Sequence, residues 1–135
     1  MFGLFKNKKK QKEKADTVAE EALTEEQKEY LMQEIEKVHQ EIKSANKEDN
    51  EHLASLYEKL GLNQAKLNEN DQAIASLEKS LEYKLSIGDG YKKLMSLYNA
   101  KRAEAAKQGD DSGIDFYMNK MDEMRQIAKK VTISR

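Results

Sequence analysis

Few residues in this chain have side chains suited to catalysis. His39 and His52 are the only histidines, and cysteine is absent, which excludes disulfides, thiol nucleophiles and cysteine-based zinc sites. The two histidines fall on different predicted helices, with no HExxH or comparable spacing around them. No catalytic pair stands out among the many carboxylates. Gly88-x-Gly90 lacks the third glycine of a dinucleotide-binding loop, so it reads as a turn. We therefore expect a non-catalytic protein without cofactor or metal.

The second chemical feature is an apolar and basic segment at the N-terminus. Three large apolar residues are followed, between positions 6 and 14, by six lysines. Such side chains can insert into a bilayer surface while the lysines face anionic headgroups, at about 1 kcal/mol per lysine. The alternative is a solvated basic tail. The candidate membrane contacts are Phe2, Leu4, Phe5, Lys6, Lys8, Lys9 and Lys10.

Charge is distributed unequally along the chain. Residues 1–14 carry +5, and because the whole chain carries −1, the remainder must carry −6. An acidic domain is poorly suited to the phosphate backbone, so we expect no nucleic-acid partner. No apolar run approaches the roughly 18 residues of a membrane span, or the roughly 7–15 of a signal-peptide core. We expect a cytoplasmic protein, with the inner face of the membrane as a further possibility.

Apolar residues at helical spacing predict five helices joined by short connections, hence antiparallel neighbours. The first begins near Thr24, where Thr24 and Gln27 have the form of a capping box, and it breaks at Asn46 or Asp49. The others are expected over about 50–67, 71–86, 91–107 and 112–130, with Leu85 facing inward. Gly88 and Gly90 are expected to close the third helix in the left-handed conformation. Residues 1–23 read as a tail and residues 24–135 as the helical domain.

A repeated spacing organises this domain. Two segments 34 positions apart share their spacing, with a tyrosine followed three positions later by a leucine in each: Tyr57-x2-Leu60-Gly61-x2-Gln64 and Tyr91-x2-Leu94-Met95-x2-Tyr98. A period of this length is typical of stacked helical hairpins. Gly61 lies inside a strong helical pattern, and close approach of a neighbouring helix would explain it. The alternative is an ordinary helical bundle in which the period is coincidental.

These residues resemble the tetratricopeptide repeat family. The matching positions in the first copy are Tyr57, Leu60, Gly61, Ala73, Leu77 and Ser80. The best repeat spans 54–87, and a divergent repeat, whose first helix is about two turns too long, spans 88–130. Gln64 stands where the family usually has an aromatic residue. The resemblance implies an all-α array of about five antiparallel helices, in which the first helix is either half a repeat or a cap.

The resemblance also implies a concave groove that binds a segment of a partner protein. Carried over by offset, the groove residues are Glu58, Leu62, Ala65, Lys66, Lys92, Ser96 and Asn99, with Ser55, Asp89 and Ala100 beside them. Some family members clamp a partner's terminal carboxylate with lysine and asparagine. Glu58 and Leu62 stand where that clamp would start, so we expect no such clamp.

Three functional hypotheses follow. The first is an adaptor that binds a protein or peptide partner through the helical surface. The second is a peripheral membrane protein tethered by its N-terminus, whose domain mainly forms homo-oligomers. The third is a regulatory subunit of an enzyme.

The methionines at 118, 121 and 124 are either core residues or, with Phe116, part of an exposed patch.

Overall fold

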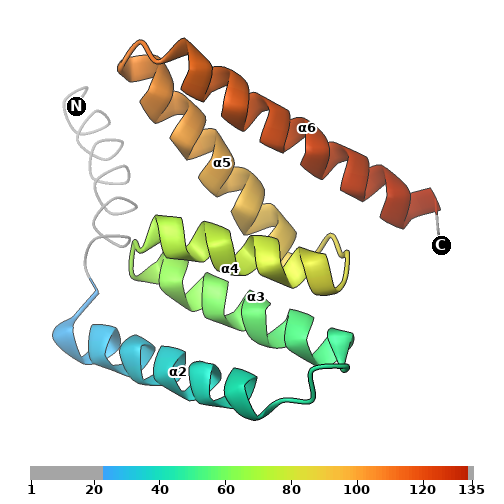
Figure 1. The fold of residues 1–135 in the computed structure, drawn as a ribbon. Coiled ribbons are helices and arrows are strands. Elements are labelled where there is room, and N and C mark those ends of the chain that lie inside the picture. The colour runs from blue at the N-terminus through green and yellow to red at the C-terminus, as the bar shows by residue number, and fades with distance from the viewer. Residues whose placement is uncertain (1–22, 134–135) are drawn as a thin grey trace, which may run out of the picture.

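The computed structural model describes residues 23–133, and these contain five helices and no strand. The all-α fold expected from the sequence is confirmed, and most helix ends, apart from that of α4, lie close to the predicted ones. The helices are α2 (Glu25–Ser44), α3 (Asn50–Lys66), α4 (Asn70–Tyr83), α5 (Asp89–Lys107) and α6 (Asp111–Ile133). Each helix packs against the next one in the chain, and α3 also contacts α5 (Figure 1). This arrangement is compatible with a helical-repeat array.

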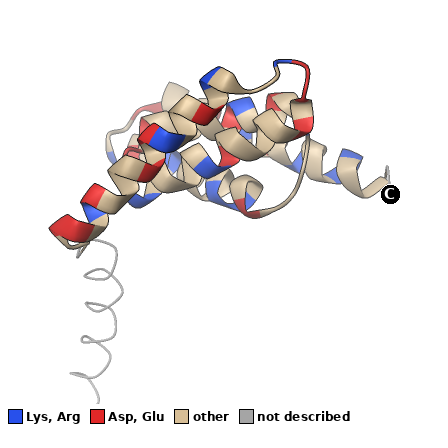
Figure 2. Ribbon diagram, turned by 90° about the horizontal axis from the view of Figure 1, so that it is seen from below, with Lys and Arg blue, Asp and Glu red and all other residues tan. Residues whose placement is uncertain are grey.

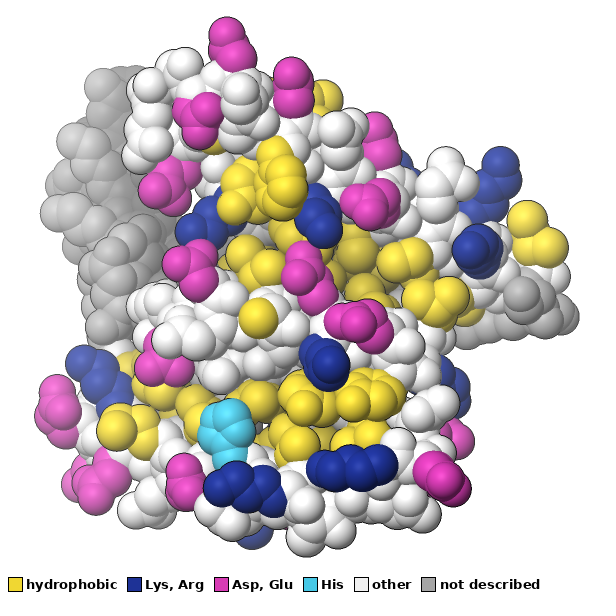
Figure 3. Space-filling view, in the orientation of Figure 1, with side chains coloured by type: hydrophobic (Ala, Val, Ile, Leu, Met, Phe, Trp, Pro, Cys, Tyr) yellow, Lys and Arg dark blue, Asp and Glu magenta, His cyan; other side chains and the backbone are white. Residues whose placement is uncertain are grey.

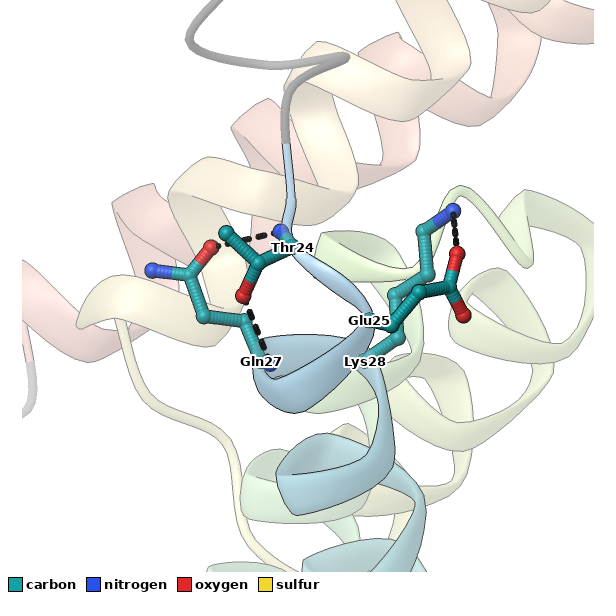
Figure 4. A network of polar contacts seen from close by, with 4 residues as sticks. All are labelled: Thr24, Glu25, Gln27 and Lys28. Carbon is teal, nitrogen blue, oxygen red and sulfur yellow. Dashed lines mark hydrogen bonds and ion pairs between the residues drawn. The ribbon is translucent and has the colours of Figure 1, made fainter.

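The start of α2 has the capping box predicted from Thr24 and Gln27 (Figure 4). The Gln27 backbone N–H donates to the Thr24 hydroxyl at 3.0 Å, and the Thr24 N–H donates to Gln27 Oε1 at 2.9 Å. Two N–H groups that the helix leaves unpaired are satisfied in this way. The next helix, α3, is capped by Asp49, which accepts from the His52 N–H at 3.1 Å. Because α2 ends at Ser44, the break between the two helices includes both Asn46 and Asp49.

The core consists of two clusters. The larger joins α4, α5 and α6 through buried side chains that include Leu77, Leu94 and Met124. The smaller joins α2 to α3 through Val38, Leu56 and Leu60. Because α2 packs on α3 at the outer side of the array, it is held by this second cluster.

Helices α3 and α4 approach each other closely at Gly61, as predicted. A Cβ atom on Gly61 would lie 2.6 Å from Leu77 Cγ and 3.2 Å from the Ala73 carbonyl oxygen. Ala73 is fully buried, and the Ser80 hydroxyl donates to the Ala54 carbonyl oxygen at 2.7 Å. Small residues at these positions let the two backbones cross, and Leu60 and Leu77 fill the space beside the crossing.

The predicted end of the third helix is wrong. Helix α4 ends at Tyr83, and Leu85 is exposed in the connection rather than inward. Gly88 has a negative φ and precedes α5, while Gly90 lies inside α5. Among the described glycines only Gly109, just after α5, is left-handed, at φ 69°. Gly90 lies instead close to the end of the Glu58 side chain: a Cβ atom there would lie 2.6 Å from a Glu58 carboxylate oxygen, so that side chain would have to shift.

The two copies of the repeated spacing occupy equivalent places. Leu60 and Leu94 are buried in their hairpins, and Gln64 and Tyr98 are buried as well. Helix α5 continues about two turns further beyond its copy of the motif than α3 does, as expected. It also begins later relative to the motif, however, so the whole helix has 19 residues against 17 in α3 and is not two turns longer.

Candidate protein-binding groove

The first helices of the two hairpins, α3 and α5, line a depression of about 490 Å³. We call it the α3–α5 groove; its lining residues are Leu62, Lys66, Asp89, Lys92, Lys93 and Ser96. Four of the seven groove residues carried over by offset are thereby brought together. They meet because α3 and α5 contact each other, which turns the same face of both helices toward one space.

A second depression of about 330 Å³ adjoins the groove and shares Lys66 and Lys93 with it. Ala65, a fifth carried-over residue, lines this second depression, together with Leu97 and with two asparagines of the α3–α4 turn region, Asn68 and Asn70. Offsets along the first helices of the hairpins do not reach the turn, so the asparagines were missed. Lys93 was missed as well, although its position next to Lys92 was a usable signal.

Glu58 has a structural task at one end of the groove. Its Oε2 atom accepts from the Gly90 backbone N–H at 2.8 Å, where α5 begins. A carboxylate at this place satisfies an N–H that the helix leaves unpaired and faces the positive end of the helix dipole. Neither Glu58 nor Asn99 lines the groove. The side-chain oxygen of Asn99 accepts from Arg102 Nε at 3.1 Å along α5.

The groove is positively charged. Lys66, Lys92 and Lys93 form no ion pair with any residue of the described range 23–133, and Asp89 is the one carboxylate among the lining residues. Elsewhere, acidic and basic residues are interspersed along the helices (Figure 2). The three lysines therefore concentrate cationic donors on a surface that is otherwise of mixed charge.

A separate and larger depression, of about 640 Å³, lies where α4, α5 and α6 face one another. We call it the α4–α6 hollow. Its apolar lining comes from the three helices and the connection after α4, through Leu81, Leu85, Leu94, Met124 and Ile127. Figure 3 shows apolar side chains exposed in a band between α6 and α4, with charged side chains at its edges.

Tyr98 forms a buried polar contact beside this hollow. Its hydroxyl donates a partly buried hydrogen bond to Glu78 on α4. Burial, reinforced by the hydrogen bond and the negative charge of Glu78, raises the pKa of Tyr98 well above its usual range. The phenol therefore stays neutral and joins α5 to α4. It occupies the slot that Gln64 fills in the first copy, where Gln64 accepts from Ser76 at 2.6 Å.

Met121 and Met124 belong to the core, whereas Met118 is exposed. Met124 is buried in the larger core cluster and Met121 packs against it. Phe116 and Met118 are about half exposed, and Lys120 Nζ lies 5.6 Å from the Phe116 ring centroid.

The candidate membrane contacts, from Phe2 to Lys10, lie outside the described residues. No helix within residues 23–133 is long and apolar enough to cross a membrane. Both histidines are exposed, and the described residues contain no cluster of three or more His, Asp or Glu side chains arranged for a metal ion.

Comparisons with protein-family models, with curated proteins and with solved structures found no match to this chain. The relation to tetratricopeptide repeats is therefore a resemblance carried by the residues quoted above.

Proposed function

We propose that this protein is a non-catalytic adaptor that binds a segment of a partner protein in the α3–α5 groove. The supporting observation is the gathering of Leu62, Lys66, Lys92 and Ser96 on one depression, at positions selected by their repeat offsets. Apolar and polar side chains on a concave surface are typical of peptide-binding sites. A cysteine-free chain suits the reducing cytoplasm, where we place this function.

The unpaired lysines specify the partner further. A segment that carries aspartate, glutamate or phosphate groups would pair with Lys66, Lys92 and Lys93, while Leu62 offers an apolar contact. Rim charges of this kind mainly affect association rate and partner choice. Binding should therefore weaken as salt concentration rises.

The test is affinity capture from the native host with the whole protein, compared with a Lys66→Glu/Lys92→Glu/Lys93→Glu variant. A partner that binds the groove should be recovered with the unmodified protein and lost with the variant. Calorimetry with that purified partner should then show a Kd weakened by tenfold or more.

The control is Lys37→Glu/Lys43→Glu, which reverses exposed charges on α2. It should leave both recovery and affinity unchanged. Equal recovery of every partner by the groove variant would contradict the proposal.

A further inference from the structure

The charged residues that line the α4–α6 hollow differ from those of the α3–α5 groove. Two lysines line the hollow, and both are already paired: Lys84 Nζ lies 3.1 Å from Glu51 Oε1, and Lys120 Nζ lies 3.9 Å from Glu78 Oε2. Glu78 also accepts from the Tyr98 hydroxyl. The cationic groups of the hollow are thus engaged by carboxylates of the same fold.

Two carboxylates of the hollow remain without such a partner. Glu82 on α4 and Glu123 on α6 are exposed and form no ion pair with any residue between positions 23 and 133. They come from the two helices that face each other across the apolar lining. The hollow therefore combines an apolar lining with two carboxylates, on two helices, that have no ion-pair partner among the described residues.

The hollow is large enough to hold side chains of a ligand. Its exposed apolar part is Leu85 with the partly buried Ile127, beside Leu81, Leu94 and Met124, which are buried, and the volume of about 640 Å³ lies within the ordinary range for binding sites. A ligand held there would remove the exposed apolar surface of Leu85 and Ile127 from water. Methionine adapts to side chains of different shape, so Met124 suits a site of this kind.

We propose that the α4–α6 hollow binds a peptide segment that carries large apolar side chains next to lysine or arginine. The apolar side chains would fill the hollow between α4 and α6, and the cations would pair with Glu82 and Glu123. An acidic segment is the wrong partner here, because it would bring like charges together. The adaptor would then have two sites of opposite charge preference, one on each side of α5.

A suitable probe is a synthetic peptide with the sequence of residues 1–14, which joins Phe2, Leu4 and Phe5 to six lysines. The receptor is the full chain carrying Phe2→Ser, Leu4→Ser and Phe5→Ser, so that its own copy of the segment does not compete. Fluorescence anisotropy of the labelled peptide should show saturable binding. The Glu82→Lys/Glu123→Lys variant should weaken the Kd about tenfold, since two attractions become repulsions.

Two controls test whether the binding depends on the hollow and on the lysines of the peptide. Lys92→Glu/Lys93→Glu, which alters only the α3–α5 groove, should leave the Kd within about twofold. A peptide with its lysines replaced by glutamate should not bind. The Met124 methyl resonance should shift on titration, which places the peptide in the hollow. Weaker binding by the unmodified chain would support the proposal, because a segment of the same chemistry would be competing.

Three results would overturn it. They are the absence of saturable binding, an unchanged Kd in the Glu82→Lys/Glu123→Lys variant, and an unshifted Met124 methyl resonance when the methyl resonances of other methionines shift. An apparent affinity that falls as the protein concentration rises would also overturn it, because a second copy of the chain would then fill the hollow. None of these results bears on the α3–α5 groove, so the proposed adaptor function stands or falls separately.

Discussion

At the scale of single residues, Gly61 has one of the most tightly packed positions in the fold. Gly61 lies against Leu77 with no space for a methyl group. Gly61→Ala should destabilise the protein by about 1–3 kcal/mol through overpacking, although alanine is the better helix former. Urea unfolding followed by circular dichroism measures this change.

The controls for Gly61→Ala separate packing from backbone effects. Gly88→Ala meets no atom closer than 3.9 Å and should cost clearly less. In a Leu77→Ala background, Gly61→Ala should cost less than in the unmodified protein, because the added methyl enters the vacated space. Equal costs in both backgrounds would show that the contact with Leu77 is not the cause.

Tyr98 predicts a particular response to alkaline pH. An unfolded tyrosine titrates near pH 10, whereas burial and the bond to Glu78 raise the pKa of Tyr98 in the folded protein. Above about pH 10 the unfolded chain therefore binds fewer protons than the folded one, so stability falls as pH rises. Tyr98→Phe should flatten this fall, and at pH 7 it should cost about 1 kcal/mol for the lost hydrogen bond.

A residual alkaline slope should persist in Tyr98→Phe. The hydrogen bond and ion pair with Asp71 raise the pKa of Lys101, and a raised lysine pKa also makes stability fall as pH rises above its usual value. Chemical unfolding at pH 7, 9, 10 and 11 measures both contributions. A variant slope identical to that of the unmodified protein would contradict the role given to Tyr98.

At the scale of elements, the α3–α4 hairpin contains a buried polar pair where the resembled family has an aromatic residue. The Ser76 hydroxyl donates to Gln64 Oε1 at 2.6 Å, and both side chains are buried. Ser76→Ala would leave the amide of Gln64 with an unpaired acceptor, at a cost of about 1–3 kcal/mol. Thermal and urea unfolding measure the loss.

The double variant Gln64→Leu/Ser76→Ala tests this reasoning. Replacing both partners by apolar groups removes the unpaired acceptor, so the double variant should be more stable than Ser76→Ala alone. Ser55→Ala makes the same substitution at an exposed place on α3 and should change stability by less than about 0.5 kcal/mol. A double variant less stable than Ser76→Ala would show that the amide still finds a partner.

Element boundaries were predicted well where side chains act locally. Thr24 with Gln27 forms its capping box within one turn, so the start of α2 needed no tertiary information. The end of α4 was misplaced because Leu85 continues the apolar spacing, yet the chain turns extended at Lys84 to reach α5. Gly90 looked like a helix terminator, whereas it lies in the first turn of α5 and its backbone N–H donates to Glu58, 32 residues away.

At the scale of the whole molecule, the array is held by neighbours rather than by one shared core. Helix α2 packs on α3 through the smaller cluster, whereas α4, α5 and α6 share the larger one. In such arrays stability is close to a sum over neighbouring contacts. Amides of α2 should therefore exchange with solvent faster than those of α3 and α4 in hydrogen-exchange mass spectrometry.

Val38→Ala sharpens this prediction, because Val38 is fully buried between α2 and α3. It should speed exchange in α2 strongly and leave exchange in α6 little changed. Val131→Ala, on the last helix, offers the same substitution outside that cluster as a control. Uniform acceleration across all five helices would indicate a single cooperative unit instead.

Residue spacing along the chain was enough to predict the helices, their order, the close approach at Gly61 and four of the residues that line the α3–α5 groove. These follow from spacing, because periodicity decides which face is apolar and a 34-residue repeat places equal offsets on equal faces. The tertiary fold was needed to show that Glu58 caps α5, that Lys93 lines the α3–α5 groove, that Asn68 lines the depression beside it, and that the α4–α6 hollow exists. These features depend on how helices cross, and a crossing is decided by side chains far apart in the chain.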